Sequence, residues 1–251
     1  MQTNETNTPW LVPFGSPRGA RVRLFCFPYA GGRVHVFRDW PRGLPQDVGV
    51  YAVQPPGRGS HLRVQPYTNL FELVAAAAEA LRPLLDGPFA FFGHSMGALI
   101  GYELARLLRA EGRTGPTHLF VSGCRAPQVR DRGEATYKLP ETEFIEELRR
   151  LNGTPREVLD HAELLQLVLP LLRADFAVAQ TYTYSEGPPL GCPLTVFGGV
   201  DDVEVRREHL ILWRELTTGD FALHMLPGDH FFLHASQAIL LEYIARQLVP
   251  A

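Results

Sequence analysis

The residues with the clearest chemical meaning lie at positions 93–97, which read Gly-His-Ser-Met-Gly. This Gly-x-Ser-x-Gly spacing stands between an apolar run at residues 89–92 and an amphipathic stretch that begins at Met96. A turn that joins a strand to a helix so abruptly strains the backbone at its central residue, so the flanking positions must be small. Such a turn lifts the serine hydroxyl above the sheet. The spacing therefore predicts that Ser95 is a nucleophile.

A serine hydroxyl becomes a good nucleophile only when a nearby base accepts its proton. In turns of this kind the base follows the serine along the chain, in the loop after the last strand. His230 meets this requirement, because it follows the apolar run 222–226 through a Pro-Gly-Asp turn. We therefore expect His230 to activate Ser95.

The base in turn needs an acidic side chain that orients its imidazole ring. Two aspartates, Asp201 and Asp202, follow the apolar run at residues 194–197. Hydrolases with this order of residues usually carry the frame Gly-x-x-Asp-x-x-Val, and Gly199, Asp202 and Val205 fit it. The frame favours Asp202 as the acid, with Asp201 as the alternative.

Acyl transfer also requires two backbone N–H groups that stabilise the negative charge on the carbonyl oxygen. Met96 is expected to supply one of them, because it is the first residue of the helix after the serine. The second comes from the loop after the first central strand, here residues 27–32 with the sequence Phe-Pro-Tyr-Ala-Gly-Gly. We expect Ala30 to donate it, with Tyr29 as the next candidate.

The elements that position these residues are visible as alternating apolar runs and amphipathic stretches. This alternation is typical of an α/β protein with a mostly parallel sheet and helices on both of its faces. Amphipathic helices are expected after Thr68 as N-cap, from about Met96, and from about Ser236. The expected strands are residues 22–27, 50–53, 89–92, 118–122, 194–197 and 222–226.

The alternation breaks between about residues 126 and 191, where two helices fit and no strand does. The first helix is expected to begin at Pro140 and to end at Gly153. The second is expected to have Thr154 as its N-cap, in a capping box, and to continue through Leu172. A helical insertion between two strands is a candidate lid over a site. The alternative is a second packing layer that does not move.

Composition and charge exclude several classes of function. The chain has 251 residues, 45% hydrophobic and 20% charged, which suits one domain over its whole length. A net charge of -3 gives no electrostatic case for nucleic acid or an anionic membrane as the partner. No apolar run approaches the roughly 20 residues that span a bilayer. We also expect no metal and no cofactor, because no ligand cluster or glycine-rich phosphate loop is present.

The amino-terminal residues and the cysteines favour the cytoplasm. The first ten residues have neither the basic start nor the apolar stretch of a secretion signal. The three cysteines are odd in number and far apart, as expected for reduced thiols.

The chain resembles a known family over nearly its whole length, the stand-alone (type II) thioesterases that accompany modular polyketide and nonribosomal peptide synthases. Many hydrolases share the serine turn. Two segments of the insertion, Asn-Gly-Thr-Pro at residues 152–155 and Leu-Arg-Ala-Asp-Phe at residues 172–176, are specific to this group. The family usually has His where this chain has Tyr29, and Gly where it has Asp229. The resemblance rests on residues 27–32, 54–58, 93–97, 151–155, 169–176, 198–202 and 227–232.

The resemblance implies the α/β-hydrolase fold with a helical lid, and an editing thioesterase. Such an enzyme hydrolyses unwanted acyl groups from the phosphopantetheine arm of an acyl or peptidyl carrier protein, and is expected to be monomeric. Tyr29 and four apolar residues of the insertion, Phe144, Leu148, Leu171 and Phe176, are candidate lining of the acyl chamber. Packing between helices is the alternative role of those four. A general carboxylesterase on the same three residues is the alternative function.

Overall fold

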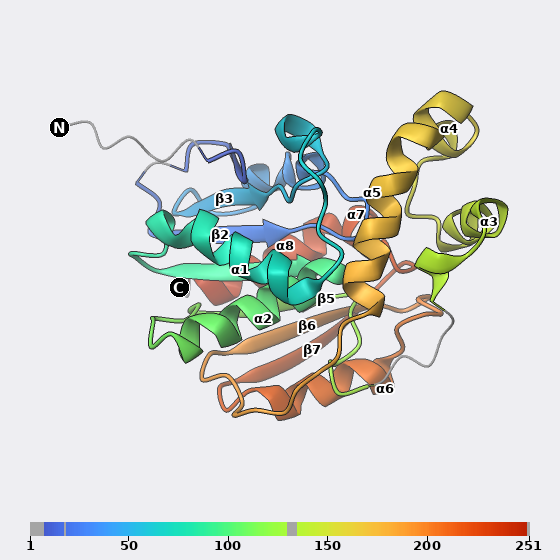
Figure 1. Cartoon of the computed structure of the whole chain (residues 1–251). Coiled ribbons are helices and arrows are strands. Elements are labelled where there is room, and N and C mark those ends of the chain that lie inside the picture. The colour runs from blue at the N-terminus through green and yellow to red at the C-terminus, as the bar shows by residue number, and fades with distance from the viewer. Residues whose placement is uncertain (1–7, 18, 130–134, 250–251) are drawn as a thin grey trace.

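One sheet organises the chain in the computed structural model, which describes residues 8–17, 19–129 and 135–249. Its strand order is β1-β3-β2-β4-β5-β6-β7 (Figure 1). Neighbouring strands are parallel except β1, which is antiparallel to β3. The strands are β1 (Leu11–Phe14), β2 (Val22–Phe27), β3 (Val48–Val53), β4 (Phe89–His94), β5 (Leu119–Ser122), β6 (Leu194–Gly199) and β7 (Phe221–Leu226).

The six expected strands are all present, and β1 is an addition that the sequence pattern did not reveal. It has only four residues, which alternate poorly between buried and exposed and include Pro13. Proline is tolerated at the edge of a sheet, where one side of the strand needs no hydrogen bonds. β1 therefore depends on its pairing with β3, a long-range contact that no local pattern records.

Two hydrophobic layers cover the sheet, because alternate residues of each strand point to opposite faces. Phe25 and Phe27 pack with α1 and α2 on one face, whereas Leu24 and Cys26 pack with α8 on the other. Figure 1 shows α1 and α2 in front of the sheet and α8 behind it. The helices of these layers and of the loops are α1 (Leu70–Leu81), α2 (Met96–Ala110), α6 (Arg207–Leu210), α7 (Phe232–Ala235) and α8 (Gln237–Leu248).

Short 3-10 turns complete the layers, and one N-cap differs from the expectation. The cap of α1 is Asn69 rather than Thr68, because the Asn69 side chain accepts hydrogen bonds from the amides of Phe71 and Glu72. The 3-10 helices are Val34–Phe37, Trp40–Arg42, Gly59–His61, Arg82–Leu84, Thr136–Lys138 and Ile211–Leu216. Within the described part of the chain, no helix is long and apolar enough to cross a membrane.

The insertion forms α3 (Glu141–Leu151), α4 (Arg156–Leu159) and α5 (Ala162–Gln180). Figure 1 shows α5 along one end of the strands, with α3 and α4 further from the sheet. The expected capping box of Thr154 is wrong, since Pro155 is the N-cap of α4 and no side chain caps it. The single second helix is also wrong, because α4 ends before α5 begins at Ala162.

Candidate active site

The turn at Ser95 has the backbone geometry that the spacing predicts. β4 ends at His94 and α2 begins at Met96, so one residue makes the whole turn. Ser95 has φ 52° and ψ −117°, a conformation that non-glycine residues rarely adopt. A Cβ atom at Gly93 would lie 2.2 Å from the Gly97 oxygen, and one at Gly97 would lie 2.1 Å from the Phe27 oxygen. Both glycines are therefore required by the close approach of the backbone.

His230 and Asp202 meet at the same edge of the sheet, because each follows the carboxyl end of a parallel strand. The Nδ1 atom of His230 lies 2.8 Å from Oδ2 of Asp202. The Asp202 side chain is 0% exposed, and the His230 side chain is 19% exposed. With Nδ1 donating to the carboxylate, Nε2 is the nitrogen left free to accept a proton.

The second oxygen of Asp202 is held by the backbone of its own loop. Oδ1 accepts hydrogen bonds from the amides of Glu204 and Val205, at 2.8 and 2.9 Å. Burial would raise the pKa of Asp202, but the hydrogen bond and charge of His230 and these two amides outweigh it and lower the pKa below the ordinary value. Asp201, the alternative, is exposed, and among the described residues no hydrogen bond or ion pair joins its side chain to His230.

Close backbone approach joins the loop of Asp202 to the loop of His230. A Cβ atom at Gly199 would lie 2.3 Å from the backbone oxygen of Asp229. The ring of His94, beside Ser95, has its centroid 5.2 Å from that of His230. Among the described residues there is no hydrogen bond between Ser95 and His230. Catalytic hydrogen bonds often tighten only when substrate binds.

His94, the last residue of β4, packs against the end of β5 next to the turn. Its side chain is fully buried, and Nδ1 lies 2.9 Å from Oγ of Ser122, a partner that the sequence pattern did not suggest. A Cβ atom at Gly123 would lie 2.7 Å from the His94 ring, so the ring fills the space there. Burial, followed by the charges of His230 and His234, holds the pKa of His94 well below its ordinary value. A neutral, packed ring suits a structural role.

The two expected oxyanion donors take no part in the hydrogen bonds of the described fold. The N–H groups of Ala30 and Met96 donate no hydrogen bond within residues 8–17, 19–129 and 135–249. The Met96 amide begins α2, and the first amides of a helix have no acceptor within it. Residues 27–32, called the oxyanion loop below, turn sharply, because the Gly32 amide donates to the Tyr29 oxygen at 2.8 Å.

Tyr29 lies between the oxyanion loop and the segment after His230. Its ring centroid is 5.0 Å from that of Phe231 and 5.7 Å from that of His94. Its hydroxyl lies 3.2 Å from Nε2 of His234, which sequence reasoning did not single out. Burial raises the pKa of Tyr29 above its ordinary value, so the phenol stays protonated and can donate. Tyr29 therefore packs on Phe231, the residue that follows the expected base.

The four apolar residues of the insertion have different surroundings. Phe144 and Leu148 are 0% and 2% exposed and belong to the hydrophobic cluster between α3, α4 and α5, which favours packing between helices. Phe176 is half-buried, with its ring 5.5 Å from that of Phe144. Leu171 faces the loop after β3, since a Cβ atom at Gly57 would lie 2.9 Å from it. Phe176 also packs against that cluster, and Leu171 is buried, so the contacts of all four side chains are with neighbouring segments and their lining role stays a prediction.

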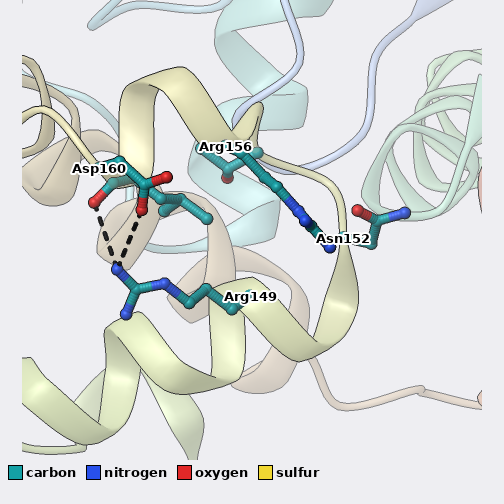
Figure 2. A pocket seen from close by; sticks show the side chains of 6 residues that line it. Arg149, Asn152, Arg156 and Asp160 are labelled. Atoms are coloured by element: carbon teal, nitrogen blue, oxygen red, sulfur yellow. Dashed lines mark hydrogen bonds and ion pairs between the residues drawn. The ribbon is translucent and has the colours of Figure 1, made fainter.

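A separate pocket of about 240 Å³ lies where α3 meets α4. In Figure 2, Arg149 faces Asp160 across one side of the pocket, and their charged atoms are 3.5 Å apart. The loop between α3 and α4 lies close to the segment after His230, because a Cβ atom at Gly153 would lie 2.5 Å from the Phe231 ring. Neither Ser95 nor His230 lines the pocket, so it is distinct from the expected catalytic residues.

The cysteine thiols offer no competing nucleophile. Burial raises the pKa of Cys124 to about 12 and that of Cys192 to about 11, and it also raises the pKa of Cys26. Because the thiolate is the reactive form, we expect the native protein to react with a disulfide reagent at pH 8 at least about tenfold more slowly than the urea-unfolded protein. Thiol counting before and after unfolding measures this. Fast labelling of a native thiol would contradict it.

The described residues also hold no group of three His, Cys, Asp or Glu side chains that could bind a metal ion. A serine in a strained strand–helix turn, with a histidine and an aspartate after later strands of a mostly parallel sheet, defines the α/β-hydrolase class. Within that class, residues 22–248 match the thioesterase domain family. This match covers most of the chain, so the protein belongs to the thioesterase family and is a hydrolase that acts on thioesters.

Individual relatives are similar over nearly the full length. Linear gramicidin dehydrogenase LgrE of Brevibacillus parabrevis is 46% identical, over 99% of this chain and 95% of that protein. The structure of the RedJ thioesterase from the prodiginine pathway of Streptomyces coelicolor has a TM-score of 0.86 at 42% identity, covering 94% of this chain and 88% of RedJ. The structure of the type II thioesterase BorB from the borrelidin cluster has a TM-score of 0.86 at 34% identity, covering 96% of this chain and 98% of BorB.

Proposed function

We propose that this protein removes stalled or aberrant acyl groups from the phosphopantetheine arms of carrier proteins in a polyketide or nonribosomal peptide synthase. The observation that carries the proposal is the 2.8 Å hydrogen bond between His230 and Asp202 at the sheet edge that also holds Ser95, in a chain of the thioesterase family. The name of LgrE includes a dehydrogenase activity, but this sequence has no Gly-x-Gly-x-x-Gly dinucleotide motif.

Acylation begins when Ser95 attacks the thioester carbonyl carbon and Nε2 of His230 accepts the hydroxyl proton. The carboxylate of Asp202 accepts the Nδ1–H bond and stabilises the imidazolium that results. The carbonyl oxygen becomes an oxyanion, which the amides of Ala30 and Met96 stabilise. Collapse of this intermediate breaks the carbon–sulfur bond, and His230 returns its proton to the departing pantetheine sulfur. The acyl group is then an ester of Ser95.

Deacylation repeats these steps with water. His230 accepts a proton from the water as its oxygen attacks the acyl-serine carbonyl, and the same two amides hold the second oxyanion. The bond between the carbonyl carbon and Ser95 Oγ breaks, and His230 protonates the serine oxygen. The products are a carboxylic acid and the free enzyme. No redox partner, metal or cofactor is consumed in this sequence.

The partner in this proposal is an acyl or peptidyl carrier protein, met by a monomeric enzyme in the cytoplasm. The relative BorB is a type II thioesterase of a biosynthetic cluster, which supports a partner of this kind. The oxyanion loop and the segment after His230 pack on each other through Tyr29 and Phe231. α5 contacts the oxyanion loop through Leu172 and Asp175, so this helix is close to any arm that reaches Ser95.

The test is thiol release from carrier proteins that bear short to long acyl groups, compared with p-nitrophenyl esters of the same acyl groups. We expect a higher kcat/KM for the carrier-bound thioester at each chain length, because contacts with the arm add binding energy that a simple ester lacks. Cleavage of esters with no cleavage of any carrier-bound thioester would leave a general carboxylesterase. The preferred acyl length would report the depth of the chamber.

A further inference from the structure

Two segments that the proposed mechanism leaves unused meet in a buried ion pair. Arg58 ends the Pro-Pro-Gly-Arg segment after β3, and Asp175 belongs to the Leu-Arg-Ala-Asp-Phe segment of α5. Nη2 of Arg58 lies 2.6 Å from Oδ1 of Asp175, and the side chains are 2% and 3% exposed. Burial of a charged pair is costly, so the remaining polar atoms of such a pair need hydrogen bonds.

Two of those remaining atoms bond to the oxyanion loop, whereas Nε of Arg58 has no hydrogen-bond partner among the described residues. Oδ2 of Asp175 accepts the Gly31 N–H at 2.7 Å, and Nη1 of Arg58 donates to the Gly32 oxygen at 3.0 Å. The loop itself adds the bond from the Gly32 N–H to the Tyr29 oxygen, at 2.8 Å. The ion pair therefore holds the backbone of the loop that carries the Ala30 amide.

These three bonds determine where the Ala30 amide points. A peptide unit is planar and trans, so the Tyr29 C=O and the Ala30 N–H lie in one plane and point in opposite directions. The C=O points to Gly32 inside the turn, so the N–H points out of the turn. Asp175 then fixes the following peptide unit through the Gly31 N–H. Hydrogen bonds thus hold the peptide units on both sides of Ala30, the one that contains its N–H and the one that follows.

α5 lies so close to the oxyanion loop that position 31 has to be a glycine. Gly31 has φ +74°, and a Cβ atom there would lie 2.5 Å from Cδ2 of Leu172. The helix that carries Asp175 thus rests directly on the oxyanion loop. Any opening movement of α5 would break the buried pair and release the loop, so α5 belongs to the framework of the site.

We propose that Asp175 and Arg58 are positioning residues, which act through Gly31 and Gly32 to aim the Ala30 amide at the reacting carbonyl oxygen. The inference rests on the proposed function, because it assumes that acyl transfer occurs at Ser95. A purely structural role would be to attach α5 to the sheet. The two roles differ in whether activity depends on the polar contacts or only on the stability of the packing.

The first variant is Asp175→Asn, which keeps the side chain's size and removes its charge. We expect kcat to fall about 10- to 100-fold with KM changed less than about threefold, because an oxyanion donor acts on the transition state. Rates are normalised to the fraction of protein that a fluorophosphonate labels. The control is Asp160→Asn, another aspartate of the insertion in an exposed ion pair with Arg149, which should leave both constants unchanged.

The second variant replaces the pair with apolar residues, Arg58→Met together with Asp175→Leu. Apolar replacement of a buried ion pair is often neutral or stabilising, so the melting temperature should return to that of the wild type while kcat stays low. Recovery of kcat together with stability would overturn the positioning role. If the double variant does not fold, the single variant decides, since unchanged kcat in Asp175→Asn overturns the inference too.

Each assay is run on a carrier-bound thioester and on a p-nitrophenyl ester. If the wild type cleaves only the ester, the proposed substrate is wrong, yet the ester kcat still decides the positioning role, because both reactions pass through an oxyanion at Ser95. A normal ester kcat in Asp175→Asn would reject the inference alone.

Discussion

Replacement of Ser95 by Ala is expected to lower kcat for thioester hydrolysis by about 10⁴- to 10⁶-fold, with KM nearly unchanged. The substitution removes the oxygen that forms the acyl-enzyme but leaves the amides of Ala30 and Met96, which explains why some activity above the uncatalysed rate should remain. The geometry of the turn should survive, because a β-carbon is already present at this position. Thiol release under saturating substrate measures the effect.

The acyl-enzyme itself provides the sharper readout. After a rapid acid quench, mass spectrometry of the wild type should find the acyl group on the peptide that contains Ser95, and the Ser95→Ala variant should carry none. Ser16→Ala is the matched control, because Ser16 is exposed and belongs to none of the segments that form the site, and it should retain full activity. An acylated Ser95→Ala enzyme would show that another residue is the nucleophile.

The sequence predicted the centre of the fold because its signals are local. A buried strand, a tight turn and a helix within about twenty residues define the surroundings of Ser95. The expected strands before Asp202 and His230 are equally compact, and both loops leave parallel strands at the same edge, so the residues had to gather there. The choice of Asp202 over Asp201 also followed a local frame. Of the two aspartates, it is Asp202 that accepts a hydrogen bond from His230.

The elements that the sequence did not predict depend on contacts between distant segments. β1 exists through its pairing with β3, and the bond between Arg58 and Asp175 joins residues 117 positions apart. Arg58 and Asp175 each belong to a segment that carries the family resemblance, yet no periodicity in the sequence could indicate that the two side chains are in contact. For Phe144 the pattern gave a buried residue, but whether it faced a chamber or another helix depended on how α3 packs on α5.

Asp202→Asn should lower kcat by about 10⁴-fold, while Asp201→Asn should change it by less than about twofold. Asn can accept a hydrogen bond at the Asp202 position but cannot stabilise an imidazolium, and it can turn its NH₂ group toward His230 and favour the wrong tautomer. The two variants make the same chemical change at adjacent positions, so a general effect on the loop would appear in both. A loss of activity in Asp201→Asn alone would reverse the assignment of the acid.

The same pair of variants tests the lowered pKa of Asp202 through stability. Since the pKa of this carboxyl is lower in the folded protein, its contribution to stability is present above the unfolded value of about 3.9 and is lost as the pH falls through the folded value. We expect Asp202→Asn to melt below the wild type at neutral pH. The difference in melting temperature should narrow in acid, because the wild-type carboxyl then becomes protonated and loses its charge.

The control is Asp201→Asn, whose melting temperature should follow that of the wild type at every pH, since the Asp201 side chain is exposed. A difference that stays constant with pH would mean that packing, rather than the charge held by His230 and the loop amides, makes Asp202 stabilising.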